Sequence, residues 1–455
     1  MFRFLNRLPG LRRPGAGAPG EAAATVAGLI SSRRDRVVST AWALVGLAGP
    51  TGLQLVYTII AARVLSASDA GNFFLVISVA TLAIAFVGFG SSGVIAKMVA
   101  LDPPNVQRYF GQAQTVTALT TVLLLPVVVV ASAFFTKGAF PVALLLFVAL
   151  AELGAMRTNM NSAYVFIAKE QQIRAAMVLC SLPLARLCAS LLAVLWPSAE
   201  RLFAFSVLYG VSSIIGAALA FAYVVRQVGP PMLSMKGFSL RDGFSFAMTS
   251  LTLSLQTESD KLILSLFGSP ADVAVYTVAS RLMDGAAMPP RALKISFQSR
   301  LFRQGALGLV STYRFTLKIL PMAAAYGLLV WAGFALLAPV IVMVFGAQYA
   351  RLAHLLPLLG ALPLARALSD YGADIFMTSD RQGLQVAIRA VATLIRVGAG
   401  VGLIYLFRLD GAVGTALGVN FGSAAVFWAI AWFMCRGKRP DPPPALAEAP
   451  AEGAH

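Results

Sequence analysis

Residues 250–268 read SLTLSLQTESDKLILSLFG, an apolar run with Glu258, Asp260 and Lys261 inside it. A charge at the centre of a bilayer costs at least about 2.5–3.5 kcal/mol. On a helix, the polar residues at positions 250, 254, 257, 258, 261, 265 and 268 share one face, and Glu258 can pair with Lys261. The stretch predicts an amphipathic transmembrane helix. Its stripe faces a water-filled cavity or the bundle interior; the alternative is a neutralised pair that only fixes helix packing.

The rest of the chain is equally apolar. Of its 455 residues 58% are hydrophobic and 12% are charged, against about 25% charged in soluble proteins, and the mean hydropathy is +0.78. Each span needs about 20 apolar residues, and the continuous runs exclude a β-barrel. The sequence predicts an all-α integral membrane protein with about 12 transmembrane helices, at 38–62, 72–96, 112–135, 139–165, 174–196, 202–225, 241–265, 274–297, 315–344, 351–378, 384–407 and 411–435.

The net charge is +17, and many of the basic residues lie in the predicted loops between spans. Every second loop is rich in basic residues, as at 33–36, 226–241 and 300–314, whereas the loops between them hold single residues such as Lys137 and Arg201. Lys and Arg collect on the cytoplasmic side of membranes. The pattern predicts a multi-pass protein with both termini in the cytoplasm, and it accounts for the basic charge without nucleic acid as a partner.

The spans divide into two halves. ARVLSASDAGNFFLV follows the first span and LILSLFGSPADVAVYTV follows the seventh, which aligns Asp69 with Asp272 and Phe73 with Tyr276. Six spans per half give both halves one orientation and predict two pseudo-symmetric six-helix lobes. The predicted organisation is a flexible basic arm at 1–37, an N-lobe at 38–225, a cytoplasmic linker at 226–240, a C-lobe at 241–435 and a disordered cytoplasmic tail at 436–455.

Other spans also carry charges. Arg366, Asp370 and Asp374 fall at i, i+4 and i+8, on one helix face. Arginine binds phosphate bidentately and stays charged, so a cavity with several arginines suits an anionic substrate such as a lipid phosphate or pyrophosphate. The substrate-cavity candidates are Arg186, Glu258, Lys261, Arg281, Arg366 and Arg396. The ion-coupling candidates are Glu152, Asp260, Asp284, Asp370 and Asp374. These carboxylates either hold the arginines in place or bind a coupling proton or cation, and packing roles remain the alternative for both sets.

Enzyme signatures are absent from the sequence. It contains no GxxxxGK[ST] loop, no HExxH and no DxD pair, and its only histidines are His354 and His455. We therefore expect no enzymatic activity, no cofactor and no metal site.

Four stretches resemble one family: ARVLSASDAGNFF, SDKLILSLFGSPADVAVYTVASRL, VFGAQYARLAHLLPLLG and LDGAVGTALG. In order and spacing they are similar to the Wzx-like O-antigen and exopolysaccharide flippases, polysaccharide biosynthesis proteins of the multidrug/oligosaccharidyl-lipid/polysaccharide (MOP) exporter superfamily. The resemblance covers most of residues 38–435. It implies two six-helix lobes around a central cavity, and it matches Asp260 to the family's charged residue in the seventh span.

The resemblance also implies a function. Such proteins move undecaprenyl-pyrophosphate-linked oligosaccharide from the cytoplasmic to the periplasmic leaflet of the bacterial inner membrane, by alternating access often coupled to an ion gradient. The implied partners are this polyprenyl-linked glycan, membrane lipids and other glycan-assembly proteins. Rival interpretations are a drug or metabolite exporter of the same superfamily, a lipid II flippase with fourteen spans, a membrane enzyme such as a polymerase, and a non-transporting scaffold.

Overall fold

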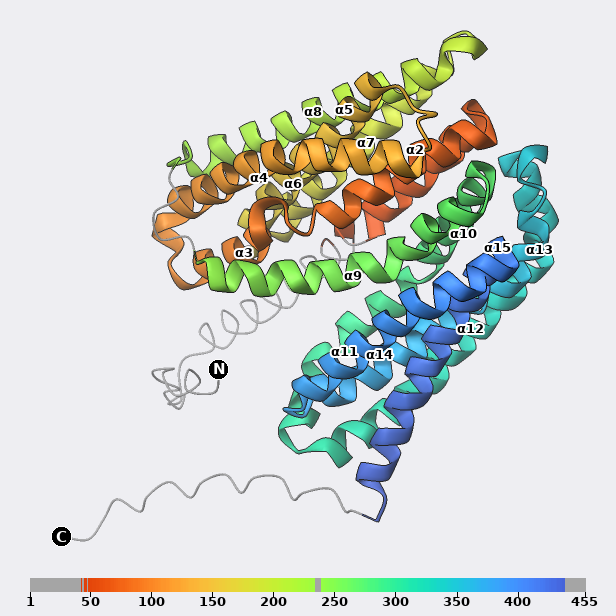
Figure 1. The fold of residues 1–455 in the computed structure, drawn as a ribbon. Coiled ribbons are helices and arrows are strands. Elements are labelled where there is room, and N and C mark those ends of the chain that lie inside the picture. Colours follow the sequence, from red (N-terminus) through yellow and green to blue (C-terminus); the bar gives the residue numbers. More distant parts are fainter. Residues whose placement is uncertain (1–41, 43–44, 47, 234–238, 438–455) are drawn as a thin grey trace, which may run out of the picture.

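The computed structural model describes residues 42, 45–46, 48–233 and 239–437. Within these residues the chain is helical and contains no strand. Helices from the two halves of the sequence form two lobes, with α9 lying between them (Figure 1). The predicted arm at 1–37, most of the predicted tail at 436–455 and part of the predicted linker lie outside the described residues.

The N-lobe begins with a helix over 48–64. It continues through α2 (Ala67–Ala83), α3 (Ser91–Leu101), α4 (Val106–Phe135), α5 (Val142–Leu150), α6 (Met156–Ala168), α7 (Gln172–Ala193) and α8 (Arg201–Val228). A 3-10 turn over Val87–Gly90 bends the α2–α3 span by 49°. Gly88, Phe89 and Gly90 all have positive φ there, a conformation that glycine adopts without steric cost.

The second half begins with α9 (Leu240–Phe267), followed by the helices of the C-lobe. These are α10 (Pro270–Ala286), α11 (Met288–Ala306), α12 (Leu309–Phe345), α13 (Leu352–Leu359), α14 (Leu362–Thr378) and α15 (Gln382–Cys435). Within α15, Arg408 has φ 50° and ψ −119°, and this break divides the 54 residues into two spans. Pro289 and Pro290 stand at the start of α11, just after the helix break at Ala287.

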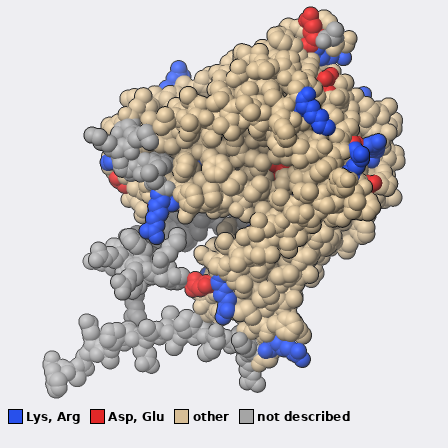
Figure 2. Space-filling model, in the orientation of Figure 1, with Lys and Arg blue, Asp and Glu red and all other residues tan. Residues whose placement is uncertain are grey.

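The helices agree with the twelve predicted spans. By length and hydropathy alone, seven described helices qualify as spans, or eight with the bent α2–α3 pair. The broken α15 contains two spans, which adds one. The remaining three spans are the helix at 48–64, α9 and the α10–α11 pair. The described part of the first is short, and the other two carry charged residues. Exposed apolar side chains such as Leu336, Met343 and Leu394 cover the outer surface, and Figure 2 shows few charged atoms on it.

The two halves repeat the same local structure. The Ser66 side chain caps α2 by accepting a hydrogen bond from the Asp69 amide. In the same way, the Ser269 side chain caps α10 by accepting a hydrogen bond from the Asp272 amide. Both helices have 17 residues. Such caps satisfy amides that have no partner within the helix. The alignment of Asp69 with Asp272 is therefore confirmed as a structural equivalence.

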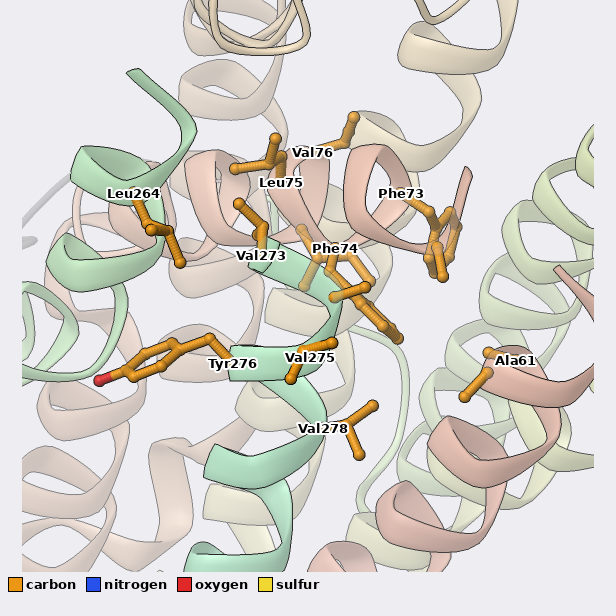
Figure 3. Packing of buried hydrophobic residues seen from close by; sticks show 14 of the residues in the cluster. Ala61, Phe73, Phe74, Leu75, Val76, Leu264, Val273, Val275, Tyr276 and Val278 are labelled. Atoms are coloured by element: carbon orange, nitrogen blue, oxygen red, sulfur yellow. The ribbon is translucent and has the colours of Figure 1, made fainter. Parts of the chain in front are cut away.

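The lobes are packed tightly where α2 meets α10. A Cβ atom on Gly71 would lie 1.8 Å from the Pro270 carbonyl oxygen, so only glycine fits this approach. Figure 3 shows Phe74 and Leu75 of α2 beside Val273 and Val275 of α10, all fully or nearly fully buried. This seam belongs to the largest hydrophobic cluster of the described chain.

Side chains from each lobe also hold the backbone of the other at this end. Arg63 donates to the carbonyl oxygens of Met343 and Val344 at the end of α12, each at 2.5 Å. Gln348 donates to the carbonyl oxygens of Ala62 (2.6 Å) and Leu65 (3.2 Å), and it accepts from the Ala67 amide at 3.1 Å. At the other end of the molecule, α11 packs on helices of its own lobe and the two lobes diverge (Figure 1).

Candidate functional site

Buried ion pairs line the inner helices of both lobes. Asp260 of α9 is 1% exposed and forms a salt bridge with Arg396 of α15, which is 5% exposed. The Tyr276 hydroxyl of α10 donates to Asp260 at 2.7 Å. The Asp260 carboxylate thus joins three helices, α9, α10 and α15.

The Glu258–Lys261 pair predicted from spacing is present. Lys261 Nζ lies 2.6 Å from Glu258 Oε2, and both side chains are about 5% exposed or less. Ser78 of α2 hydrogen-bonds to Glu258, so the pair contacts the opposite lobe. In this conformation the pair is closed off from solvent, and it can line a water-filled cavity only after the lobes move.

The α10 and α14 charges interlock. Arg281 Nη1 lies 3.7 Å from Asp284, and Arg366 of α14 approaches the same carboxylate at 2.7 Å. One turn further along α14, Asp370 pairs with Arg389 of α15 at 2.8 Å. The third member of the α14 face, Asp374, is 2% exposed and pairs with Lys294 of α11 at 2.9 Å.

The N-lobe holds a separate cluster around Glu152. Arg186 of α7 lies 2.7 Å from Glu152, which also accepts a hydrogen bond from Tyr209 of α8. Arg186 donates to Ser213 at 2.9 Å, and its guanidinium lies 4.4 Å from the centre of the Tyr209 ring. Glu152 belongs to a π-helical turn over Ala151–Ala155, a distortion that is frequent at functional sites.

The two clusters occupy equivalent places in the repeat. Arg186 is the fifteenth residue of α7, and Arg396 is the fifteenth residue of α15. Each arginine pairs with a buried carboxylate that a tyrosine also contacts. The structure thus brings together Arg186 with Glu152 in one lobe and Arg396 with Asp260 in the other, but it keeps the two clusters apart.

A cavity of about 330 Å³ lies between α9, α11, α14 and α15. Its charged lining comprises four arginines and one carboxylate: Arg291, Arg366, Arg389, Arg396 and Asp370. Three of these arginines are already paired, Arg366 with Asp284, Arg389 with Asp370 and Arg396 with Asp260, so the four arginines and three carboxylates leave a formal excess of one positive charge. Polar groups such as Gln256, Thr257 and Asn420 complete the wall. The cavity thus presents guanidinium donors, most of them held by carboxylates, to any anion that enters it.

An apolar groove adjoins this cationic cavity. It has a volume of about 490 Å³ and runs along the two halves of α15. The two spaces share Ala392, Val419 and Ser423 in their walls, and apart from Thr415 and Ser423 the groove is lined by aliphatic residues and glycine. A polar chamber and an apolar channel thus meet at one edge.

Sequence reasoning missed several polar residues of these sites. Arg291, Lys294, Tyr209 and Tyr276 contact the predicted charges or the cavity. Arg291 and Lys294 are three residues apart on α11, a spacing that could have marked them as a pair on one helix face. Arg157 was also missed, although the polar run MRTNMNS at 156–162 marks its position. Among the described residues, no group of three His, Cys, Asp or Glu side chains is placed to hold a metal ion.

A family model described as "Polysaccharide biosynthesis protein" matches residues 38–296, more than half of the chain. The chain belongs to this family. A comparison with curated proteins found no match.

The fold matches solved transporters of the MOP superfamily. An inward-facing multidrug resistance MATE family transporter is 18% identical, with 86% of this chain and 98% of that chain covered and a TM-score of 0.70. An outward-facing multidrug resistance MATE family transporter is 16% identical, with 88% of this chain and 94% of that chain covered and a TM-score of 0.59. A MOP superfamily transporter from Pyrococcus furiosus is 16% identical, with 88% of this chain and 95% of that chain covered and a TM-score of 0.63. This polysaccharide biosynthesis family member therefore shares the fold of these transporters, with two six-helix lobes.

Proposed function

We propose that this transporter is a flippase that moves lipid-pyrophosphate-linked oligosaccharide from the cytoplasmic to the periplasmic leaflet of the bacterial inner membrane. The observation that carries the proposal is the cavity lined by four arginines, three of which are held by carboxylates. A diphosphate is the most highly charged part of such a substrate. Planar guanidinium groups bind phosphate oxygens in pairs, and a low-dielectric setting strengthens the attraction.

The apolar groove beside the cavity supports a lipid-linked substrate. A polyprenyl chain is uncharged and long, so it cannot enter the polar chamber without loss of free energy. The groove along α15 gives the chain an apolar surface while the diphosphate lies in the chamber. A soluble anion would need only the chamber.

The proposed direction of transport is supported by the contrast between the two ends of the molecule. The described helices of the two lobes pack closely at the α2–α10 seam and diverge toward the opposite end (Figure 1). Under the positive-inside rule, the basic loops that contain Lys97, Lys169 and Arg241 would face the cytoplasm. The higher TM-score against an inward-facing relative supports the same orientation. Release then requires the seam to open and the cytoplasmic ends to close.

Ion coupling would involve the buried carboxylates. Glu152 and Asp260 are each held by an arginine and a tyrosine, and a proton or cation that displaced the arginine would free the helix that carries it. Substrate-cavity roles for Arg186, Glu258, Lys261, Arg281, Arg366 and Arg396, and coupling roles for Glu152, Asp260, Asp284, Asp370 and Asp374, are part of this proposal.

A drug exporter is the second candidate, because the matched solved structures include multidrug resistance transporters. Exporters of cationic drugs need an acidic chamber, and the excess of arginine here opposes that substrate. The Pyrococcus furiosus transporter offers a parallel, since the reverse polarity of its binding pocket suggests a different function for that protein.

The test is a deletion strain examined for surface polysaccharide and for lipid-linked oligosaccharide in inner-membrane vesicles. Loss of polymer with intact oligosaccharide on the cytoplasmic leaflet is expected. Normal polymer with increased drug sensitivity would assign the protein to the exporters. Single unpolymerised units accumulating on the periplasmic side would indicate a polymerase.

A further inference from the structure

Arg157 of α6 is a buried cation that forms no ion pair with any carboxylate of the described residues. Its side chain is 7% exposed, its Nε atom makes no hydrogen bond, and no carboxylate of the described chain lies within ion-pair distance. The comparable buried cations Arg186, Lys261 and Arg396 each have a carboxylate partner. A buried cation with no counter-charge is unfavourable, so the fold retains it at a cost in stability.

The repeat sharpens this contrast. Arg157 lies eleven residues before the end of α6, and Arg366 lies twelve residues before the end of α14. The two arginines therefore stand within one residue of equivalent positions in the two lobes, since Arg157 corresponds to Ala367, the neighbour of Arg366. Arg366 is neutralised by Asp284 at 2.7 Å, whereas the described part of the N-lobe has no carboxylate in the corresponding place.

The backbone makes room for the guanidinium. Gly88 has φ 71° in the break between α2 and α3, and a Cβ atom there would lie 2.9 Å from Arg157 Nε. Any larger residue at this position would therefore meet the arginine as well as adopt a strained backbone. The helix break and the arginine form one local structure.

Arg157 faces a cavity of about 390 Å³ between α3, α6 and α9. Ligand sites usually measure about 300–1,000 Å³. Lys97 lines the same cavity, with a side chain that is 46% exposed and paired with Asp242. Tyr164 and Ser250 add hydroxyl groups to the wall.

We propose that this cavity is a second phosphate-binding subsite, in which Arg157 and Lys97 receive the diphosphate of the incoming substrate before it reaches the cationic cavity. The inference rests on the proposed function. Ser250 of α9 faces the Arg157 cavity and Thr257 of the same helix faces the other, two turns or about 10 Å further along. The diphosphate would pass along α9 from the cavity that Arg157 faces to the cavity lined by four arginines.

The test measures ligand-induced thermal stabilisation of the full-length protein in detergent. The probes are farnesyl diphosphate and inorganic pyrophosphate, and the variants are Arg157→Gln and Arg157→Lys. The matched control is Arg174→Gln, which removes an N-lobe arginine hydrogen-bonded to Gln171. We expect Arg157→Gln to weaken farnesyl diphosphate binding by about tenfold or more, the value of a charge-assisted hydrogen bond, while Arg157→Lys restores part of it.

Stability without ligand gives an independent readout. Removal of an unpaired buried charge should leave the unfolding temperature unchanged or raise it, whereas loss of a packing residue would lower it. A destabilised Arg157→Gln protein that binds farnesyl diphosphate like the wild type would overturn the subsite. If Arg157→Gln loses binding of inorganic pyrophosphate but keeps binding of farnesyl diphosphate, the cavity is a site for free phosphate compounds, and its assignment to the lipid-linked substrate is overturned.

The two proposals fail differently. If binding depends on Arg366 but not on Arg157, the flippase proposal stands and the second subsite is refuted. If the wild-type protein binds neither diphosphate but binds a cationic drug, the proposed function fails, and the subsite fails with it.

Discussion

Neutralising Asp260 should destabilise the protein more than any change to an exposed pair. In an Asp260→Asn variant the amide can still accept from Tyr276, but Arg396 loses its counter-charge while only 5% exposed. Breaking a buried ion pair on one side costs about 3–5 kcal/mol. Because folded proteins are stable by only about 5–15 kcal/mol, this is a large share of the total. We expect a clear fall in the unfolding midpoint in detergent.

Two further variants separate charge from shape. Asp410→Asn removes the carboxylate of an exposed pair with His354, in which both side chains are more than 60% exposed, and should cost less than about 1 kcal/mol. The double variant Asp260→Leu with Arg396→Met removes both buried charges, and replacement by apolar groups is often neutral for stability. We expect it to unfold near the wild-type midpoint.

An Asp260→Asn protein that unfolds at the midpoint of Asp410→Asn would refute this reasoning. Transport by the double variant then gives a second answer. A stable double variant that no longer exports polysaccharide assigns the pair to the transport cycle, whereas a stable and active one assigns it to packing.

Three other changes test the seam and the cavity. Gly71→Val should force α2 away from the Pro270 carbonyl and speed hydrogen exchange at the start of α2; Gly402→Val, at an open position, is the control. Gln348→Ala removes three hydrogen bonds to the 62–67 turn, about 1 kcal/mol each, and unchanged exchange there would contradict the bracing role. Arg366→Gln should lower binding of farnesyl diphosphate with little loss of stability, because the side chain lines the cavity and is 19% exposed.

Local patterns in the sequence predicted the spans well because each pattern is short. Apolar runs and the i, i+3 spacing of Glu258 and Lys261 are each contained within one helix. The division of α15 was also predictable, since Arg408 and Asp410 interrupt an apolar run. Hydropathy fixes such features before any packing is known.

Pairings between distant spans could not be predicted in the same way. Asp260 and Arg396 are 136 residues apart, and no periodicity links α9 to α15. The same holds for Asp374 with Lys294 and for Glu152 with Arg186. These partners depend on how helices rotate and pack, which the spacing within one helix leaves open.

The repeat places equivalent arginines in both lobes but supplies their carboxylates from different helices. Arg186 pairs with Glu152 inside the N-lobe, so that cluster moves as one unit with its lobe. Arg396 pairs instead with Asp260 of α9, the helix that also contacts α2 through Glu258 and Ser78. The C-lobe cluster therefore ties α15 to a helix lying between the lobes. An event that frees Asp260 from Arg396 therefore acts directly on α9, whereas the same event at Glu152 reaches the seam only through Tyr209, whose ring packs on Phe73 of α2.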